Sequence, residues 1–111
     1  MRHIAIEGTT IAVDDEGYLL NLDEWSEAVA VCLAEEEEIL LSEAHWEIIH
    51  VIRDFYLQYE LSPAMRPLVK AVGLALGPQK GKSIHLMKLF PESPAKQAAK
   101  LAGLPKPTNC L

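Results

Sequence analysis

Residues 42–59 read SEAHWEIIHVIRDFYLQY, and this stretch decides the fold because it carries the broadest apolar face of the chain. Ser42 is a helix-capping residue type, and its hydroxyl can satisfy the first free backbone N–H groups. Apolar side chains then recur at helical spacing, at Trp46, Ile49, Ile52, Phe55, Tyr56 and Tyr59. We therefore predict a helix from about Glu43 to Tyr59 at the centre of the core.

Short β-type segments precede this helix. His3–Glu7, Ile11–Val13 and Tyr18–Leu20 alternate with turns, which predicts a small antiparallel β-meander over residues 1–20. Three such strands are too few to be stable alone and must pack on helices.

The segment that follows predicts a first helix, capped by Asn21 or Asp23. Its apolar stripe contains Cys32, and the full stripe is Trp25, Ala28, Val29, Cys32 and Leu33. We therefore interpret Cys32 as a buried, inert thiol. The acidic run Glu35–Glu38 is expected to be a solvated helix end.

Three more helices are predicted after residue 60. Ser62-Pro63, Ser83 and Ser93-Pro94 are start signals, and Gly103 is the stop signal of the last helix. The predicted fold class is α+β and mainly helical, with the β-meander packed on about five helices. We expect a single domain with a helical body over residues 21–102.

Residues 103–111, GLPKPTNCL, are predicted to form an extended C-terminal arm. Pro105 and Pro107 disfavour the α conformation for Leu104 and Lys106. At ~3.3 Å per residue, such an arm could reach about 25 Å from the body. We expect it to bury little surface, so that its removal leaves the melting behaviour nearly unchanged.

The composition and the distribution of charged residues indicate a cytoplasmic protein with an uneven charge along the chain. The chain has 111 residues and a net charge of −6. Residues 1–60 hold fifteen Asp/Glu against two Arg, and residues 61–111 hold eight Lys/Arg against Glu92 alone. This asymmetry predicts one acidic and one basic face, or merely two solvated helix surfaces. No apolar run approaches the ~20 residues that span a bilayer, and no signal peptide begins the chain, so no membrane association is expected.

Cys110, one residue from the end of the chain, is the candidate reactive group. No histidine lies within ten residues of it, and no Cys-His-Asp arrangement is present, so it is a poor nucleophile by itself. The four histidines lack metal-ligand spacing, and the loop Gly77–Lys82 lacks the full phosphate-loop pattern. We therefore expect no metal and no cofactor, and a carrier fits these residues better than a hydrolase.

Several motifs together carry a family resemblance. The run Lys88–Leu111 reads KLFPESPAKQAAKLAGLPKPTNCL, and shorter motifs lie upstream at DEGYL (15–19), WSE (25–27), HWE (45–47), VIRDFY (51–56) and SPAMR (62–66). In these motifs the chain resembles the TusE/DsrC family of sulfur carriers, whose penultimate cysteine holds a persulfide. The resemblance implies a small sheet against an array of helices, a sulfurtransferase activity with Cys110 as the persulfide-bearing residue, and an arm that engages partners through Gly103, Leu104, Pro105, Lys106 and Pro107.

Position 99 separates the two branches of this family. The DsrC branch has a second cysteine eleven residues before the penultimate one, and here that position is Ala99. The resemblance therefore points to the TusE-like branch, which relays sulfur toward 2-thiolation of the tRNA wobble uridine. It implies a TusBCD-like donor acting through its TusD subunit and an MnmA-like tRNA thiouridylase as acceptor, with tRNA contacted at most indirectly.

Other roles stay open at this point. Lys80, Lys82, Lys88, Lys96, Lys100 and Lys106 are candidates for contacts with tRNA phosphate or an acidic partner, or they only solubilise helix faces. A partner or regulator of sulfite-reductase or sulfur-oxidation metabolism is one alternative function. A DNA-binding module with a helix-turn-helix-like pair around Ser62 is another, although the acidic net charge argues against it.

Overall fold

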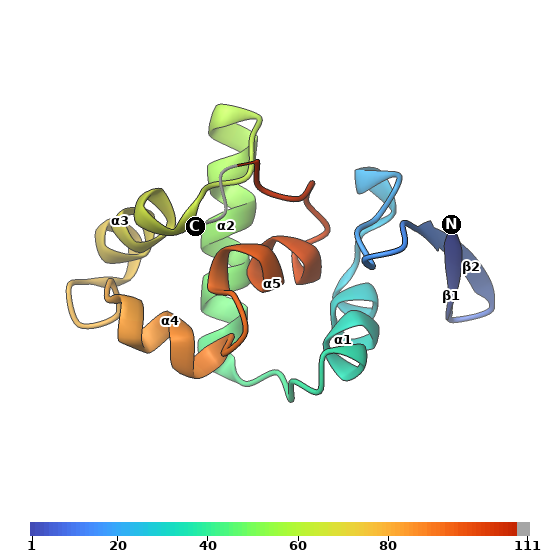
Figure 1. The fold of residues 1–111 in the computed structure, drawn as a ribbon, viewed down its shortest axis with the longest axis horizontal. Helices are drawn as coiled ribbons and strands as arrows, with labels where there is room; N and C mark the ends of the chain where they lie inside the picture. The colour runs from blue at the N-terminus through green and yellow to red at the C-terminus, as the bar shows by residue number, and fades with distance from the viewer. Residues whose placement is uncertain (109–111) are drawn as a thin grey trace.

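The computed structural model describes residues 1–108, in which a two-stranded sheet lies at one end of a helical body (Figure 1). Strands β1 (Arg2–Ile6) and β2 (Thr9–Val13) are antiparallel, with Ile4 opposite Ile11. The two-residue turn between them holds Glu7 at φ 48° and Gly8 at φ 87°, the positive-φ pair that a tight hairpin needs.

The predicted third strand is wrong. Only Val13 and Leu19 bridge, and residues 18–20 form no strand. The Asp14 carboxylate accepts hydrogen bonds from the backbone N–H groups of Glu16 and Tyr18, both at 2.9 Å. The single bridge is made by two backbone hydrogen bonds, from Asp14 N–H to the Tyr18 carbonyl at 2.8 Å and from Leu20 N–H to the Ala12 carbonyl at 3.2 Å.

The first helix begins later than predicted. Asn21 caps only a short 3₁₀ turn, η1 (Leu22–Glu24), and Asp23 lies inside that turn. Helix α1 (Glu27–Glu36) is capped instead by Ser26, whose hydroxyl accepts a hydrogen bond from Val29 N–H at 3.3 Å. Val29, Ala30, Leu33 and Ala34 form its buried face.

Helix α2 (Glu43–Tyr59) is confirmed at both ends. Ser42 and His45 form a reciprocal capping box, and the second ring nitrogen of His45 contacts the Leu89 carbonyl at 2.8 Å. Its buried residues are His45, Ile48, Ile49, Val51 and Ile52, whereas Tyr59, predicted to face the core, is 53% exposed. In Figure 1 the last turn of α2 extends beyond α3 and α5, which leaves Tyr59 in contact with water.

Helices α3 (Met65–Leu76), α4 (Ser83–Leu89) and α5 (Pro94–Leu101) complete the body. The predicted cap at Ser62 is wrong, because Ala64 occupies that position without a side-chain hydrogen bond. Helix α5 contacts all four other helices, and its fully buried Ala98 and Ala99 permit this close approach.

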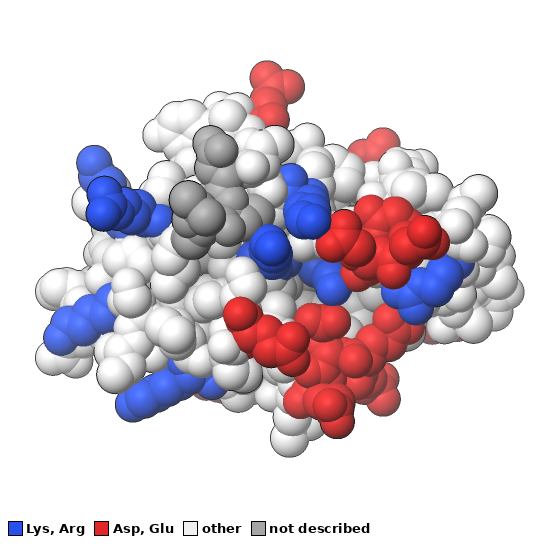
Figure 2. Space-filling model, viewed as in Figure 1, with Lys and Arg blue, Asp and Glu red and all other residues white. Residues whose placement is uncertain are grey.

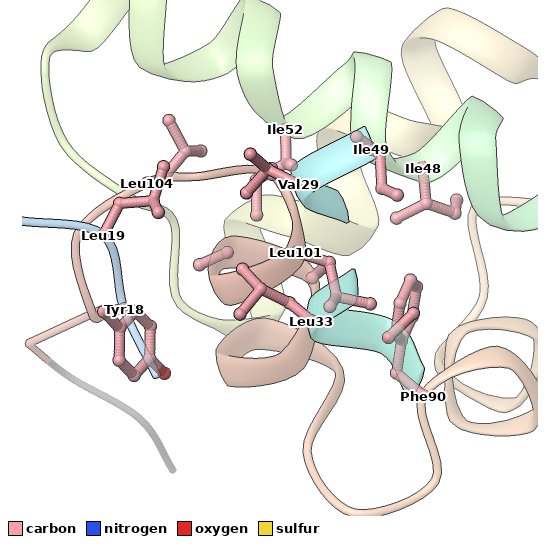
Figure 3. Packing of buried hydrophobic residues seen from close by; sticks show 14 of the residues in the cluster. Tyr18, Leu19, Val29, Leu33, Ile48, Ile49, Ile52, Phe90, Leu101 and Leu104 are labelled. Carbon is pink, nitrogen blue, oxygen red and sulfur yellow. The ribbon is translucent and has the colours of Figure 1, made fainter. Parts of the chain in front are cut away.

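One hydrophobic cluster joins the sheet, the helices and the start of the arm (Figure 3). It includes Val13 from β2, Val29 from α1, Ile52 from α2, Leu101 from α5 and Leu104 beyond it. Over residues 1–108, no helix has the length and apolar character needed to cross a membrane.

Candidate functional site

The candidate site is the C-terminal arm, and its geometry begins at Gly103. Gly103 N–H donates to the Lys100 carbonyl at 3.1 Å, and Leu104 N–H donates to the Ala99 carbonyl at 2.9 Å. This pair of bonds is a Schellman motif, which requires a left-handed residue, and Gly103 has φ 74°. The prediction that Gly103 ends the last helix is confirmed.

The side chains of Trp25 and Arg53 donate hydrogen bonds to the turn that ends α5. The Trp25 indole N–H donates to the Leu101 carbonyl at 2.8 Å, and Arg53 Nη1 donates to the Ala102 carbonyl at 2.7 Å. The Arg53 guanidinium also lies over the Trp25 ring, 3.8 Å from its centroid. Both side chains therefore satisfy backbone carbonyls at the end of α5, where a helix leaves such groups unpaired.

Arg53 is partly removed from water in this position. Burial lowers the pKa of its guanidinium, and the nearby Asp54 carboxylate opposes that shift. An arginine stays charged under such conditions, because its reference pKa is far above neutral. Its hydrogen bond to Ala102 is therefore charge-assisted.

Residues 104–107 form neither helix nor strand, and they lie against the body and do not project from it. Leu104 is 3% exposed and Pro107 is buried. Ser62 Oγ donates to the Pro105 carbonyl at 2.6 Å, and Lys106 Nζ contacts both carboxylate oxygens of Glu16 at 3.0 and 3.1 Å. We call this set of contacts of residues 104–107 the clasp.

The clasp corrects two expectations. The described part of the arm does not leave the body at Gly103, so the reach of about 25 Å from that point does not apply to it. The arm also buries more than expected, since Leu104 belongs to the hydrophobic cluster. Local sequence cannot show this, because Ser62 and Glu16 are 43 and 90 residues away from their partners.

Only one of the two cysteines, Cys32, lies within the described residues. Cys110, the predicted persulfide-bearing residue, lies outside the described residues. Cys32 is a free thiol on α1, packed against the hydrophobic cluster but only half-buried. Burial raises its thiol pKa, and the Glu36 and Glu35 carboxylates raise it further. Cys32 therefore holds its proton more tightly than an ordinary thiol, which suits the predicted inert role.

The candidate lysines are not gathered at one place. Lys100 pairs with Glu37 at 3.2 Å and Lys80 with Glu47 at 2.8 Å. Lys82, Lys88 and Lys96 make no ion pair within residues 1–108. Figure 2 shows the Lys and Arg side chains in separate groups over α3, α4, α5 and beside the sheet, whereas most acidic side chains of this face gather over α1 and the segment between the sheet and α1.

Glu37 also departs from the expected solvated helix end. Its carboxylate accepts a hydrogen bond from Gln97 at 3.1 Å as well as the Lys100 ion pair. Glu37 thereby ties the end of α1 to α5. Among residues 1–108, no three His, Cys, Asp or Glu side chains lie together in a way that could hold a metal ion.

Sequence reasoning missed four residues of the site as functional positions: Glu16, Trp25, Arg53 and Ser62. Trp25 was placed only in an apolar stripe, and Ser62 only as a helix cap. All four did carry a signal, since each belongs to one of the motifs of the family resemblance. Nothing local indicated that Trp25 and Arg53 would meet at the end of α5, or that Glu16 and Ser62 would hold the arm.

The chain is similar in sequence to a known protein family and to named proteins of that family. Residues 5–111 match the family described as DsrC like protein. Sulfurtransferase TusE of Sodalis glossinidius (strain morsitans) is 60% identical over 104 residues, which cover 94% of this chain and 96% of that protein. Sulfurtransferase TusE of Escherichia coli (strain K12) is 52% identical over 108 residues, covering 97% and 99%.

Solved structures agree over the same length. The NMR structure of Allochromatium vinosum DsrC has a TM-score of 0.90 and 50% identity, and it covers 98% of this chain and 97% of that chain. The crystal structure of the oxidized γ-subunit of the dissimilatory sulfite reductase (DsrC) from Archaeoglobus fulgidus has a TM-score of 0.86 and 37% identity, covering 99% and 100%. The chain therefore belongs to the DsrC-like family and is a sulfurtransferase.

Proposed function

We propose that the chain is a cytoplasmic sulfur-relay protein that accepts sulfur on Cys110 and passes it to a tRNA 2-thiouridylase. The observation that carries this proposal is the penultimate thiol on an arm whose start is fixed to the body by Trp25 and Arg53. Near-full-length similarity to proteins named sulfurtransferase TusE supports the same role. The donor is a TusBCD-like complex, through its TusD subunit, and the acceptor is MnmA-like.

The first transfer is a thiol exchange. The Cys110 thiolate attacks the outer sulfur of a persulfide on the donor, the sulfur–sulfur bond of the donor breaks, and the donor leaves as a thiolate. Cys110 then carries the extra sulfur as Cys110-S-SH. The overall reaction moves one sulfur atom and needs no external oxidant or reductant.

The second transfer repeats this chemistry with the acceptor. A thiolate of the acceptor attacks the terminal sulfur of Cys110-S-SH, and Cys110 departs as a thiolate. Position 99 supports an intermolecular step, because an alanine stands there and helix α5 therefore supplies no second thiol. The cargo must therefore leave to another protein.

Loading of Cys110 is tested by mass spectrometry. Incubation with a persulfide donor should add about 32 Da, one sulfur atom, to the peptide that ends at Leu111. Cys110→Ser should abolish the addition and Cys32→Ser should retain it. Equal labelling of the Cys110→Ser protein would exclude Cys110 as the carrier.

The acceptor is tested by reconstitution. The loaded protein, an MnmA-like thiouridylase, ATP and unmodified tRNA should yield 2-thiouridine, whereas the unloaded protein should not. Delivery of the sulfur only to a sulfite reductase, with none to tRNA, would favour the alternative role in sulfite-reductase metabolism.

A further inference from the structure

Side-chain donors from separate parts of the chain converge on α5 and the start of the arm. They reach backbone carbonyls along this stretch, with Tyr18 on Lys96, Trp25 on Leu101, Arg53 on Ala102 and Ser62 on Pro105. A helix end that faces water needs no such donors, because water pairs with its free carbonyls. The convergence therefore indicates that the backbone at the start of the arm is held in one conformation.

The last four carbonyls of this helix end all have partners within the protein. The backbone turn pairs two of them, through Leu104 N–H on Ala99 and Gly103 N–H on Lys100. The other two, those of Leu101 and Ala102, depend on Trp25 and Arg53. Leu101 and Ala102 are fully buried, so loss of a donor leaves a carbonyl that regains a partner only when the turn opens to water.

Arg53 makes two contacts at once in this place. Its Nη1 donates to the Ala102 carbonyl at 2.7 Å, and its guanidinium lies 3.8 Å from the centroid of the Trp25 ring. The Trp25 ring in turn lies against Gly103, where a Cβ would overlap it. A planar guanidinium can donate and stack together, whereas the ammonium of a lysine can only donate. Arg53, Trp25 and the turn thus form one continuous set of contacts.

We propose that Trp25 and Arg53 are positioning residues of the sulfur relay, which keep the turn at Gly103 closed and so give the arm one direction. Opening of this turn withdraws Leu104 from the hydrophobic cluster and frees the start of the arm. A tether with more conformations brings its thiol to a partner's site less often, so the effective concentration of the thiol falls. This inference rests on the proposed relay function and assigns two residues to it.

Transfer kinetics test this role with Arg53→Met, which keeps a side chain of similar length and removes the donor and the charge. With the persulfide-loaded TusBCD-like complex of the same genome, the maximal rate of sulfur transfer should fall about tenfold. The KM should be unchanged, because the body that binds the complex is unchanged. Loading of the thiol by inorganic polysulfide should also be unchanged, since a small ion reaches the thiol in any direction of the arm.

Two further variants serve as controls. Arg2→Met removes an arginine from β1, where its guanidinium makes an exposed ion pair with Glu36 at 3.7 Å, and it should change neither rate. Arg53→Lys should recover only part of the maximal rate, because the ammonium keeps a charge and a donor but cannot stack on Trp25.

Amide hydrogen exchange tests the closed turn in the absence of any partner. Arg53→Met should speed exchange of the Gly103 and Leu104 amides about tenfold and leave the amides of α3 unchanged. Uniformly faster exchange over all helices would show a general loss of stability and would overturn the positioning role.

The kinetic outcomes separate this inference from the relay itself. A wild-type maximal rate of transfer in the Arg53→Met protein would overturn the inference and leave the relay intact. Faster transfer would overturn it as well, because the closed turn would then restrain the arm. Failure of polysulfide to load Cys110 in the wild-type protein would instead contradict the proposed function, and the exchange of Gly103 and Leu104 would still report on the turn.

Discussion

Gly103 satisfies two independent demands at the residue scale. Its φ of 74° closes helix α5, and a Cβ at this position would overlap the Trp25 ring. Trp25 in turn is fixed by its bond to Leu101 and by Arg53. The direction in which the arm leaves α5 is thus set by three residues from separate parts of the chain, Gly103, Trp25 and Arg53.

Gly103→Ala should lower the free energy of unfolding by about 2–4 kcal/mol, because it adds a left-handed backbone cost to a steric overlap. Gly8→Ala is the matched control, since Gly8 also has positive φ but has open space around it. The control should lose only about 1–2 kcal/mol. Urea unfolding of both variants measures the difference, and equal losses would contradict the role of Trp25.

Cys32 should react more slowly with iodoacetamide at pH 7.5 than a model thiol does. Its raised pKa keeps the reactive thiolate scarce, so its alkylation should rise only at a pH above that at which an ordinary thiol ionises. Labelling of the Cys110→Ser protein across pH, followed by peptide mass spectrometry, gives the profile. A profile at or below the pH of a model thiol would contradict the effect of burial and the two glutamates.

At the scale of elements, the clasp turns part of the arm into a piece of the folded body. It combines one buried side chain, Leu104, with the hydrogen bond from Ser62 and the ion pair with Glu16. The ion pair is exposed to solvent and contributes little, about 0–1 kcal/mol. Burial of Leu104 is the larger contribution, about 1.5–3 kcal/mol.

Deletion of residues 104–111 should therefore destabilise the protein by about 2–3 kcal/mol. Deletion of residues 109–111 leaves the clasp intact and serves as the control. Thermal unfolding of the two truncated proteins separates the outcomes. An unchanged melting temperature for the longer deletion would contradict the stabilising role of the clasp and would mean that the arm buries little surface.

At the scale of the whole molecule, α5 joins the other helices. It contacts α1, α2, α3 and α4, and Glu37, Gln97 and Lys100 link it further to the end of α1. The arm follows directly from this central helix (Figure 1). The position of the arm is therefore coupled to the packing of the entire body.

Ala99→Leu should cost about 1–3 kcal/mol in unfolding free energy, because a fully buried alanine has no room for three more carbons. Ala75→Leu adds the same atoms at an exposed position of α3 and should cost less than about 0.5 kcal/mol. Chemical denaturation of both proteins tests this. An unfolding free energy unchanged by Ala99→Leu would mean that α5 is not closely packed at this position.

The sequence by itself determined the features encoded within a few residues. The cap at Ser42, the end of α5 at Gly103, the end of helical structure before Pro105 and the penultimate thiol are all local, because caps, φ restrictions and periodicity act over one or two turns. Expectations failed where tertiary contacts compete with local ones, among them the third strand, the cap at Ser62, the burial of Tyr59 and the free arm.

Only the tertiary structure decided where the arm lies. The Ser62 hydroxyl that could have capped α3 bonds to Pro105 instead, and Glu16 in the turn after β2 meets Lys106. These partners are 43 and 90 residues apart, so no window of the sequence contains both. The chain specified a thiol on a proline-stiffened segment, and the packing around Trp25, Arg53 and Leu104 fixed that segment to the body.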